Sequence, residues 1–205
     1  MIEVTDRDGL RRVRLNRPEK ANSLTREMLE AIAEAAETAG ETRAFVLTGT
    51  GKVFSAGADL EAAKAGLAVD AVWERVSGAI AALPCLTVAA LNGTLAGGAF
   101  GMALACDMRI CVPQARFFYP VMRLGFLPQP SDPGRLAALV GPARAKRILM
   151  GGAKIEAEEA LRIGLVEAVV APGDLEAQVE TLCTDALGAG PAHIAAIKGL
   201  FRGAG

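Results

Sequence analysis

The feature that most constrains this chain is a window of 30 residues, Ser77 to Cys106, without a single charged side chain. Uncharged stretches of 18 residues or more are the usual mark of a transmembrane helix. The glycine at every fourth position from 93 to 101 also matches a packing motif of membrane helices. However, Pro84 and the Asn92-Gly93 pair interrupt the window, and both are typical of turns. We therefore expect a helix end, a strand, a turn and a second helix, all buried in a soluble domain.

Composition supports one soluble domain, 1–205. The 205 residues are enough to bury a substantial core. With 22 Lys+Arg against 23 Asp+Glu, the chain has no basic field for nucleic acid or a membrane surface. A single His excludes chemistry that needs several imidazoles.

Cysteine usage and the first residues predict a cytoplasmic protein. The N-terminal residues 1–6 have neither the basic nor the apolar region of a signal peptide. Four cysteines lie in apolar surroundings without CxxC spacing, so we expect reduced core residues and no metal site. They are Cys85, Cys106, Cys111 and Cys183.

Strand patterns alternate with helical patterns in the first two thirds of the chain, which predicts a mostly parallel sheet with crossover helices. The expected strands are 2–5 and 11–15, joined as a hairpin at Asp8-Gly9, and 45–48, 86–90 and 108–112. The expected helices are 25–39, 71–83, 98–105, 135–140, 143–150, 156–161, 174–187 and 192–201. The prediction is one α/β domain, in which strands and helices alternate over 1–132 and the C-terminal part over 133–205 is mainly helical.

Two glycine-containing turns each follow a predicted strand and precede a helix. They span Phe54–Leu60 and Asn92–Gly98. If the two strands are neighbours, free N–H groups in both turns can be directed at one oxygen atom, which is the geometry of an oxyanion hole. Neither turn carries a dinucleotide-binding or P-loop motif. The alternative is that the small residues only permit close packing of helix on strand.

Four segments in this order resemble the crotonase superfamily, the enoyl-CoA hydratase/isomerase family. They are Leu15–Leu24, Phe54–Leu60, Asn92–Asp107 and Gly164–Val166. The resemblance covers essentially the whole chain. It implies a ββα superhelix, with the ββα core over 1–132, that assembles as a homo-oligomer, a trimer or a pair of trimers.

The resemblance also implies an acyl-CoA thioester as ligand, so that coenzyme A is part of the substrate and no cofactor is permanently bound. By analogy, the CoA path is lined by Ala21, Ser23, Ala56, Asp59 and Leu60. The backbone N–H groups of Ala58 and Gly98 would hold the thioester oxygen. One fixed donor of this kind is worth roughly 3–4 kcal/mol of barrier.

The sequence departs from the family where proton transfer is expected. Hydration in the family uses two glutamates, and the corresponding positions here are Gly101 and Val121. A third position, used by some isomerases and hydrolases, is Gln129. Since a positioned acid or base supplies about 10²–10⁴-fold in rate, ordinary two-glutamate hydration is not expected.

A few other acidic residues could supply the missing proton transfer. Asp132 is the nearest candidate for catalysis, although Ser131-Asp132-Pro133 is typical of a helix N-cap followed by proline. Asp59 and Glu61 are expected to complement a helix dipole.

Two further polar side chains are expected to have structural rather than catalytic roles. Tyr119 is expected in a pocket wall or in the core, where it could also hydrogen-bond a substrate. His193 is expected at the surface.

Two hypotheses follow. The first is an acyl-CoA enzyme of fatty acid metabolism, a lyase or isomerase that stabilises an enolate with backbone amides. It would use an unusual proton carrier, or chemistry that needs none, such as decarboxylation or thioester hydrolysis. The second is a non-catalytic acyl-CoA binder or a subunit that supports an active homologue. Family members usually continue with helices that close the acyl pocket and mediate trimer contacts, so the shortened C-terminus bears on both hypotheses.

Overall fold

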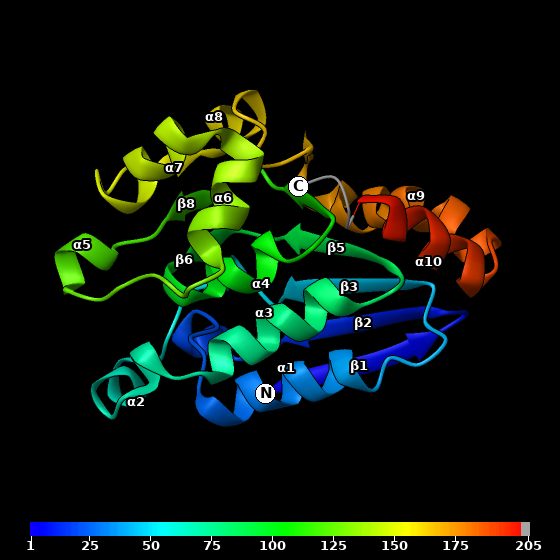
Figure 1. The fold of residues 1–205 in the computed structure, drawn as a ribbon, viewed down its shortest axis with the longest axis horizontal. Helices are drawn as coiled ribbons and strands as arrows, with labels where there is room; N and C mark the ends of the chain where they lie inside the picture. Colours follow the sequence, from blue (N-terminus) through cyan, green and yellow to red (C-terminus); the bar gives the residue numbers. More distant parts are fainter. Residues whose placement is uncertain (202–205) are drawn as a thin grey trace.

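The computed structural model describes residues 1–201 and is built on a six-stranded sheet (Figure 1). Its strand order is β1-β2-β3-β5-β7-β10. The strands are β1 (Ile2–Arg7), β2 (Leu10–Leu15), β3 (Ala44–Gly49), β5 (Leu86–Leu91), β7 (Met108–Cys111) and β10 (Ala168–Val169). The β1–β2 hairpin is antiparallel and every other pairing in this sheet is parallel. The predicted hairpin and the mostly parallel sheet are therefore confirmed.

A second, four-stranded sheet was not predicted. Its order is β4-β6-β8-β9, and its strands are β4 (Val53–Ser55), β6 (Thr94–Ala96), β8 (Arg116–Phe118) and β9 (Ile155–Glu156). Strands of two or three residues are too short to show an alternating pattern, so the sequence predicts β4 and β6 only as parts of turns. Because β4 follows β3 and β6 follows β5, this sheet continues the chain beyond the carboxyl ends of the large sheet.

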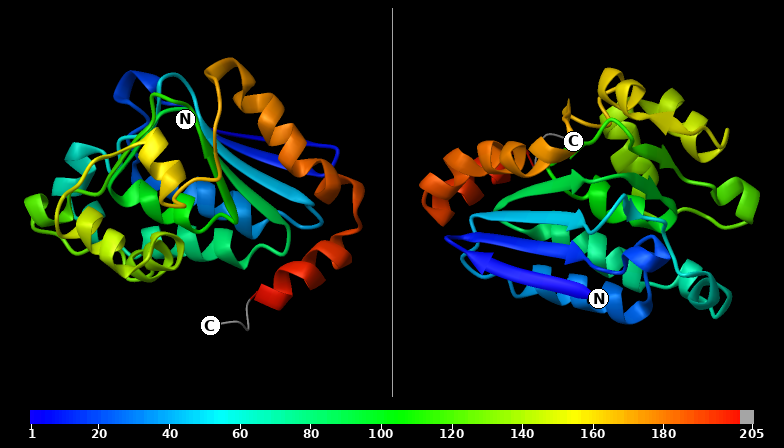
Figure 2. Two further views of the ribbon diagram at one scale, coloured as in Figure 1. Left: turned by 90° about the horizontal axis from the view of Figure 1, so that it is seen from above. Right: turned by 180° about the vertical axis from the view of Figure 1, so that it is seen from behind.

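Helices cover both faces of the large sheet. On one face α1 (Arg26–Glu37) packs against α3 (Val72–Ala82), and on the other α9 (Leu175–Gly188) lies over β3 and β5 (Figure 2). Thr25 caps α1, since its side chain accepts a hydrogen bond from Met28 N.

Short helices and the C-terminal helices complete the fold. They are η1 (Pro18–Lys20), α2 (Leu60–Lys64), η2 (Leu67–Val69), η3 (Gly97–Ala99), α4 (Phe100–Leu104), α5 (Val121–Leu124), α6 (Asp132–Val140), α7 (Pro142–Leu149), α8 (Ala157–Arg162), η4 (Pro172–Asp174) and α10 (Pro191–Leu200). The helices expected after residue 133 are all present, within three residues of the expected bounds at each end. Residues 202–205 of the predicted domain lie outside the described part.

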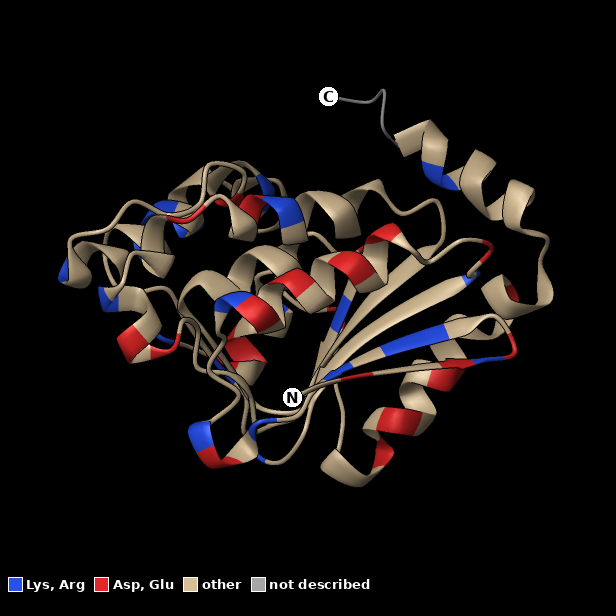
Figure 3. Cartoon of the chain, turned by 90° about the horizontal axis from the view of Figure 1, so that it is seen from below, with Lys and Arg blue, Asp and Glu red and all other residues tan. Residues whose placement is uncertain are grey.

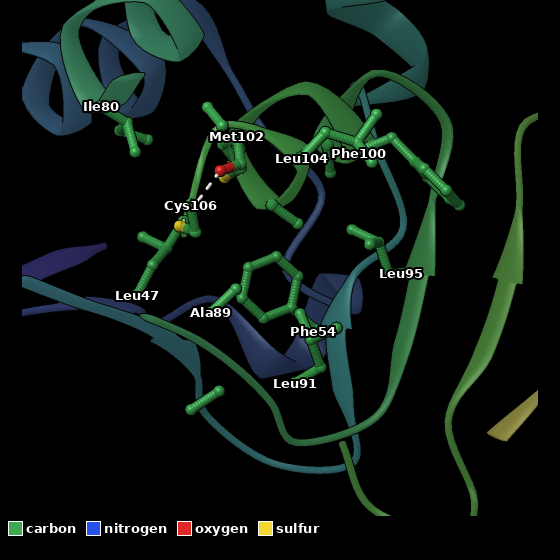
Figure 4. Close-up of a cluster of buried hydrophobic side chains, with 14 of the residues drawn as sticks. Leu47, Phe54, Ile80, Ala89, Leu91, Leu95, Phe100, Met102, Leu104 and Cys106 are labelled. Atoms are coloured by element: carbon green, nitrogen blue, oxygen red, sulfur yellow. Dashed lines mark hydrogen bonds between the residues drawn. The ribbon is translucent and has the colours of Figure 1, made fainter. Parts of the chain in front are cut away.

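The uncharged window forms the centre of the fold. It supplies the end of α3, all of β5 and β6, and α4, whose residues are all buried. Side chains of this window, such as Ala89, Phe100 and Met102, pack with Leu47 and Phe54 (Figure 4). Positively and negatively charged residues are instead interspersed over the outer helices, the loops and parts of the strands (Figure 3). Among residues 1–201, no helix has the length and apolar character needed to cross a bilayer.

The four cysteines are buried and unpaired, as predicted. Burial raises the pKa of Cys85 to about 11 and that of Cys106 to about 12. Thiols with such pKa values stay protonated near neutral pH and are poor nucleophiles. They act here as small apolar core residues.

Candidate active site

The two glycine turns meet beyond the carboxyl ends of β3 and β5. These strands are neighbours, and the same holds for β4 and β6, which carry the turns. Gly57 has a φ of +91°, and a Cβ on it would lie 2.9 Å from the carbonyl oxygen of Ala96. The turns therefore touch through their backbones, which only glycine permits at this position.

The pairing of Ala58 with Leu24 turns the Ala58 N–H away from the Leu24 strand. Leu24 N donates to Gly57 O and Asp59 N donates to Leu24 O, each at 2.8 Å, which forms an isolated parallel bridge. In such a bridge the N–H and C=O of the residue opposite Leu24, which is Ala58, point away from the Leu24 strand. The Ala58 N–H therefore takes no part in the bridge with Leu24.

Gly98 lies in η3, at the start of the segment that continues into α4. A Cβ on Gly98 would lie 3.2 Å from the Trp73 ring, so this backbone runs against the indole face. The ring is held in place, since Trp73 Nε1 donates to Leu67 O at 2.7 Å. Trp73 thereby supports the peptide that carries the Gly98 N–H.

Ala58 and Gly98 line one cavity of about 160 Å³. Its walls come from both turns, η2, α3, the end of β8 and α5, and they are mostly apolar. Among the described residues that line it, the polar side chains are those of Tyr119, Gln129 and Trp73. A desolvated cavity strengthens the hydrogen bonds that backbone donors make to an anionic oxygen.

The residues expected along the CoA path fall into two groups. Ala56 and Leu60 line the cavity, and Ala56 N donates to Ala21 O at 3.0 Å, which joins these two alanines side by side. Ser23 and Asp59 instead belong to a polar cluster with Arg17, described next.

Arg17 ties the first CoA-path segment to the turn of Ala58. Its guanidinium donates to Asp59 Oδ2 at 2.8 Å and to Ser23 O at 3.1 Å. The other Asp59 oxygen caps α2 by accepting from Glu61 N and Ala62 N. The Arg17 hydrogen bond holds the pKa of Asp59 below its usual value. The predicted helix-start role of Asp59 is confirmed, and its oxygens are occupied by structural contacts.

Gly101, Val121 and Gln129 stand at the three positions where the family resemblance implies a carboxylate. Gly101 is buried in α4, Val121 lines the cavity at the start of α5, and Gln129 donates from Nε2 to Ala68 O at 3.3 Å. Glu61, the other acidic residue considered nearby, pairs at the surface with Lys64.

The N-cap prediction for Asp132 is wrong. Helix α6 begins at Asp132, so this residue occupies its first position, and Ser131 makes no side-chain cap. Ser131 N and Oγ donate instead to the Glu74 carboxylate of α3. The Asp132 side chain is fully buried and turned inward, where its Oδ2 accepts a hydrogen bond of 2.9 Å from Tyr119 OH.

The second oxygen of Asp132 faces α4. Asp132 Oδ1 has no hydrogen-bond partner among residues 1–201, and a Cβ on Gly101 would lie only 2.8 Å from it. Desolvation raises the pKa of Asp132 to about 7, against the hydrogen bond from Tyr119 and the charge of Arg135, which lower it. Asp132 thus combines burial with a protonation change near neutral pH.

Tyr119 connects Asp132 to the cavity that it lines. Its ring stacks on Phe100 with centroids 5.5 Å apart, and its oxygen accepts from Gln129 N at 3.4 Å. Burial and the Asp132 carboxylate raise the pKa of Tyr119 above its usual value. The expected pocket-wall position is borne out. The pairing with Asp132, 13 residues along the chain, has no signal in the sequence because it depends on how β8 and α6 meet.

His193 lies away from this cavity. It is exposed near the start of α10 and lines a separate groove of about 700 Å³ between α9, α10 and the sheet. Its expected surface position is confirmed.

Comparisons with known proteins agree with this architecture. The family model for enoyl-CoA hydratase/isomerase matches residues 5–204. YngF of Bacillus subtilis (strain 168), which carries the same family description, is 39% identical over 196 residues, covering 91% of this chain and 75% of its own. A carnitinyl-CoA dehydratase of Salmonella enteritidis is 36% identical over 211 residues, covering 98% and 80%.

Solved structures give the same result. An enoyl-CoA hydratase from Mycobacterium avium subsp. paratuberculosis K-10 matches with a TM-score of 0.90 and 32% identity, covering 99% of this chain and 85% of that one. A structure from Thermobifida fusca YX, solved in complex with CoA, matches with a TM-score of 0.89 and 29% identity, covering 99% and 84%. The chain has the crotonase fold and belongs to the enoyl-CoA hydratase/isomerase family.

Proposed function

We propose that this protein processes acyl-CoA thioesters by stabilising an enolate-like oxyanion with the backbone N–H groups of Ala58 and Gly98. The observation that carries the proposal is the contact between the two turns, which places Ala58 and Gly98 in the wall of one mostly apolar cavity. Proton transfer next to a thioester carbonyl builds negative charge on its oxygen, and donors fixed in advance stabilise that charge without reorganisation.

The CoA moiety is assigned to the path by Ala21, Ala56 and Leu60. Leu60 is 78% exposed at the rim of the cavity, and Ala21 is joined to Ala56 by the backbone hydrogen bond. Ser23 and Asp59 act through Arg17 by holding the two segments together. The CoA complex of the Thermobifida fusca relative supports this part of the proposal. CoA enters as part of the substrate and no permanent cofactor is required.

A homotrimer or a pair of trimers in the cytoplasm completes the proposal. Exposed apolar side chains around α5 support self-association, since Leu124 is 58% and Leu127 is 84% exposed. Light scattering coupled to gel filtration checks the mass, and a monomer at micromolar concentration contradicts this part.

A second candidate function is a non-catalytic acyl-CoA binder or a supporting subunit. The residues at Gly101, Val121 and Gln129 favour it, because none of these side chains transfers protons. The two candidates share ligand binding and differ in turnover.

Calorimetric titration with butyryl-CoA and CoA tests the shared part. Since Trp73 is the chain's one tryptophan and lies against Gly98, quenching of its fluorescence reports a thioester that reaches the oxyanion donors. We expect butyryl-CoA to bind and to change this fluorescence, and absence of binding overturns the proposal. Gly98→Ala, which pushes a Cβ against the indole, should weaken the binding of butyryl-CoA. Gly78→Ala, in open space on α3, should leave this binding unchanged.

A panel of enoyl-, malonyl- and hydroxyacyl-CoA thioesters then separates the two candidates. Turnover of one member supports the enzyme. Binding without turnover of any member supports the second candidate.

A further inference from the structure

The side chain of Asp132 occupies the space that a side chain at position 101 would need. A Cβ on Gly101 would stand 2.8 Å from Asp132 Oδ1 and 3.5 Å from its carboxyl carbon. The carboxyl group therefore lies where the side chain of residue 101 would begin. A glutamate is expected there from the family resemblance, but here the carboxylate comes from α6.

Resting on the proposed function, we propose that Tyr119 and Asp132 form the proton relay of this site, with Tyr119 facing the thioester and Asp132 behind it as its positioning and proton-exchanging partner. Tyr119 lines the same cavity as Ala58 and Gly98, whereas Asp132 has no exposed surface. The 2.9 Å hydrogen bond from Tyr119 OH to Asp132 Oδ2 is the connection between them.

The proton transfers in this relay balance without the formation of a tyrosinate. For proton removal, the C–H bond next to the thioester carbonyl breaks, its proton goes to the Tyr119 oxygen, and the Tyr119 proton goes to Asp132 Oδ2. The electron pair of the broken bond moves into the enolate, whose oxygen is held by the two backbone donors. The return of the proton reverses each step. Tyr119 needs this partner because burial and the neighbouring carboxylate disfavour a tyrosinate.

Groups packed around Asp132 leave it able to change protonation. Tyr119 faces it from the position just after β8, Glu74 from α3 and Arg135 from its own helix. Burial makes the largest contribution and raises the pKa of Asp132, and Glu74 raises it further. Arg135 and the Tyr119 hydrogen bond lower it. The proton reaches Oδ2 along its hydrogen bond with Tyr119, and Oδ1 has no partner among residues 1–201 whose hydrogen bond this transfer would disturb.

One relay suits a reaction in which a single group removes and returns a proton. Hydration also requires a second group to activate water, and the described cavity offers only Tyr119, Gln129 and the Trp73 indole as polar-side-chain lining. The inferred reaction class is therefore proton exchange at the α-carbon and migration of a carbon–carbon double bond in an acyl-CoA thioester.

The test uses butyryl-CoA in D₂O, with mass spectrometry to follow deuterium at the α-carbon, and 3-hexenoyl-CoA to follow conversion to the conjugated isomer. We expect both Asp132→Asn and Tyr119→Phe to slow these reactions by about 100-fold or more. Both variants keep side-chain shape, and Tyr119→Phe keeps the stacking on Phe100. Asp174→Asn, an exposed aspartate beyond the site, is the matched control.

Two readouts distinguish a relay from a structural role. The wild-type rate of deuterium uptake should rise with pH through about 7, the pKa of Asp132, and Asp132→Asn should lose this rise. Tyr119 is the chain's one tyrosine, so its ionisation can be followed by absorbance, and Asp132→Asn should lower its pKa.

The outcomes separate the relay from the proposed function. Wild-type rates in both variants, with butyryl-CoA still bound, overturn the relay and leave the oxyanion proposal standing. Binding of butyryl-CoA with no deuterium uptake in the wild type also overturns the relay. Absence of binding in the wild type overturns the proposed function itself.

Discussion

Asp132 Oδ1 lies 2.8 Å from the point that a Cβ would occupy on Gly101. Real Cβ atoms are essentially never so close to another heavy atom, and Asp132 is fully buried, so its carboxyl group has little room to move. The aspartate on α6 and any side chain on this face of α4 therefore exclude one another. Glycine at 101 and aspartate at 132 form a matched pair.

Gly101→Ala tests this pairing through stability. Alanine normally favours a helix interior over glycine by about 1 kcal/mol, but overpacking against Asp132 should reverse the sign and destabilise the fold by about 1–3 kcal/mol. Gly101→Ala in an Asp132→Gly background should lose most of this penalty. Urea unfolding of the four proteins gives the coupling energy.

Gly78→Ala on α3 is the control for that series, since a Cβ there meets nothing within 4 Å. It should be neutral or stabilising. Additive effects of the substitutions at 101 and 132 would contradict the contact.

Stability of Asp132→Asn should depend on pH relative to the wild type. The folded-state pKa of Asp132, about 7, lies above its unfolded value of 3.8, so the folded state holds the extra proton between these values. This contribution is fully present below about pH 4 and is lost as pH rises through 7. Asparagine never ionises, so its advantage over aspartate should grow across this window, to a limit on the order of 4 kcal/mol.

Unfolding in urea at pH 5 and pH 8 measures this difference, because other titrating groups cancel between the two proteins. A difference in unfolding free energy that stays constant with pH would contradict the raised pKa.

Asp59 should matter for both helix capping and acyl-CoA affinity. Asp59→Ala removes the α2 cap and the Arg17 ion pair together, and should cost about 1–2 kcal/mol of stability. Asp59→Asn retains a capping oxygen and should cost less. Both variants should weaken the binding of butyryl-CoA, because Asp59 adjoins the Ala58 peptide. Calorimetry and urea unfolding check the two effects, and an unchanged affinity in Asp59→Ala contradicts the positioning role.

The larger elements could be predicted because the hydrophobic pattern and the turn or cap residues that define each one lie within the element itself. The hairpin at Asp8-Gly9, the buried strand β3 and the capped helix α1 all follow from residues within a few positions of one another. The placement of the two glycine turns at one edge also followed, since parallel strands end on the same side.

The second sheet and the Asp132 pairing could not be predicted in this way. Strands β4 and β6 are three residues long. They form because the segments that follow β3 and β5 run side by side beyond the large sheet. Asp132 follows serine and precedes proline, a local pattern that favours capping. Tertiary packing against Tyr119 and Gly101 turns its side chain into the core instead, which no neighbouring residue signals.

Lys198 is expected to fasten α10 to the body of the fold. Its ammonium donates to Asp107 Oδ2 at 2.8 Å and to Cys85 O at 2.9 Å, while its side chain is only 14% exposed. Asp107 is itself fixed by Thr87, whose N and Oγ1 also bond to it. Lys198→Met keeps the apolar stem and removes the donors. We expect faster amide exchange in α10, with the rest of the chain unchanged.

Hydrogen exchange with mass spectrometry measures this segment by segment, and Lys146→Met on α7 is the control for loss of an exposed lysine. The Cys85 carbonyl and Asp107 each lose a partner in Lys198→Met, and Asp107 retains Thr87, so the body should keep its protection. Equal protection of α10 in the wild type and Lys198→Met would show that the apolar contacts of α10 suffice without the lysine. Loss of protection throughout the sheet would instead assign Lys198 to global stability rather than to the attachment of one helix.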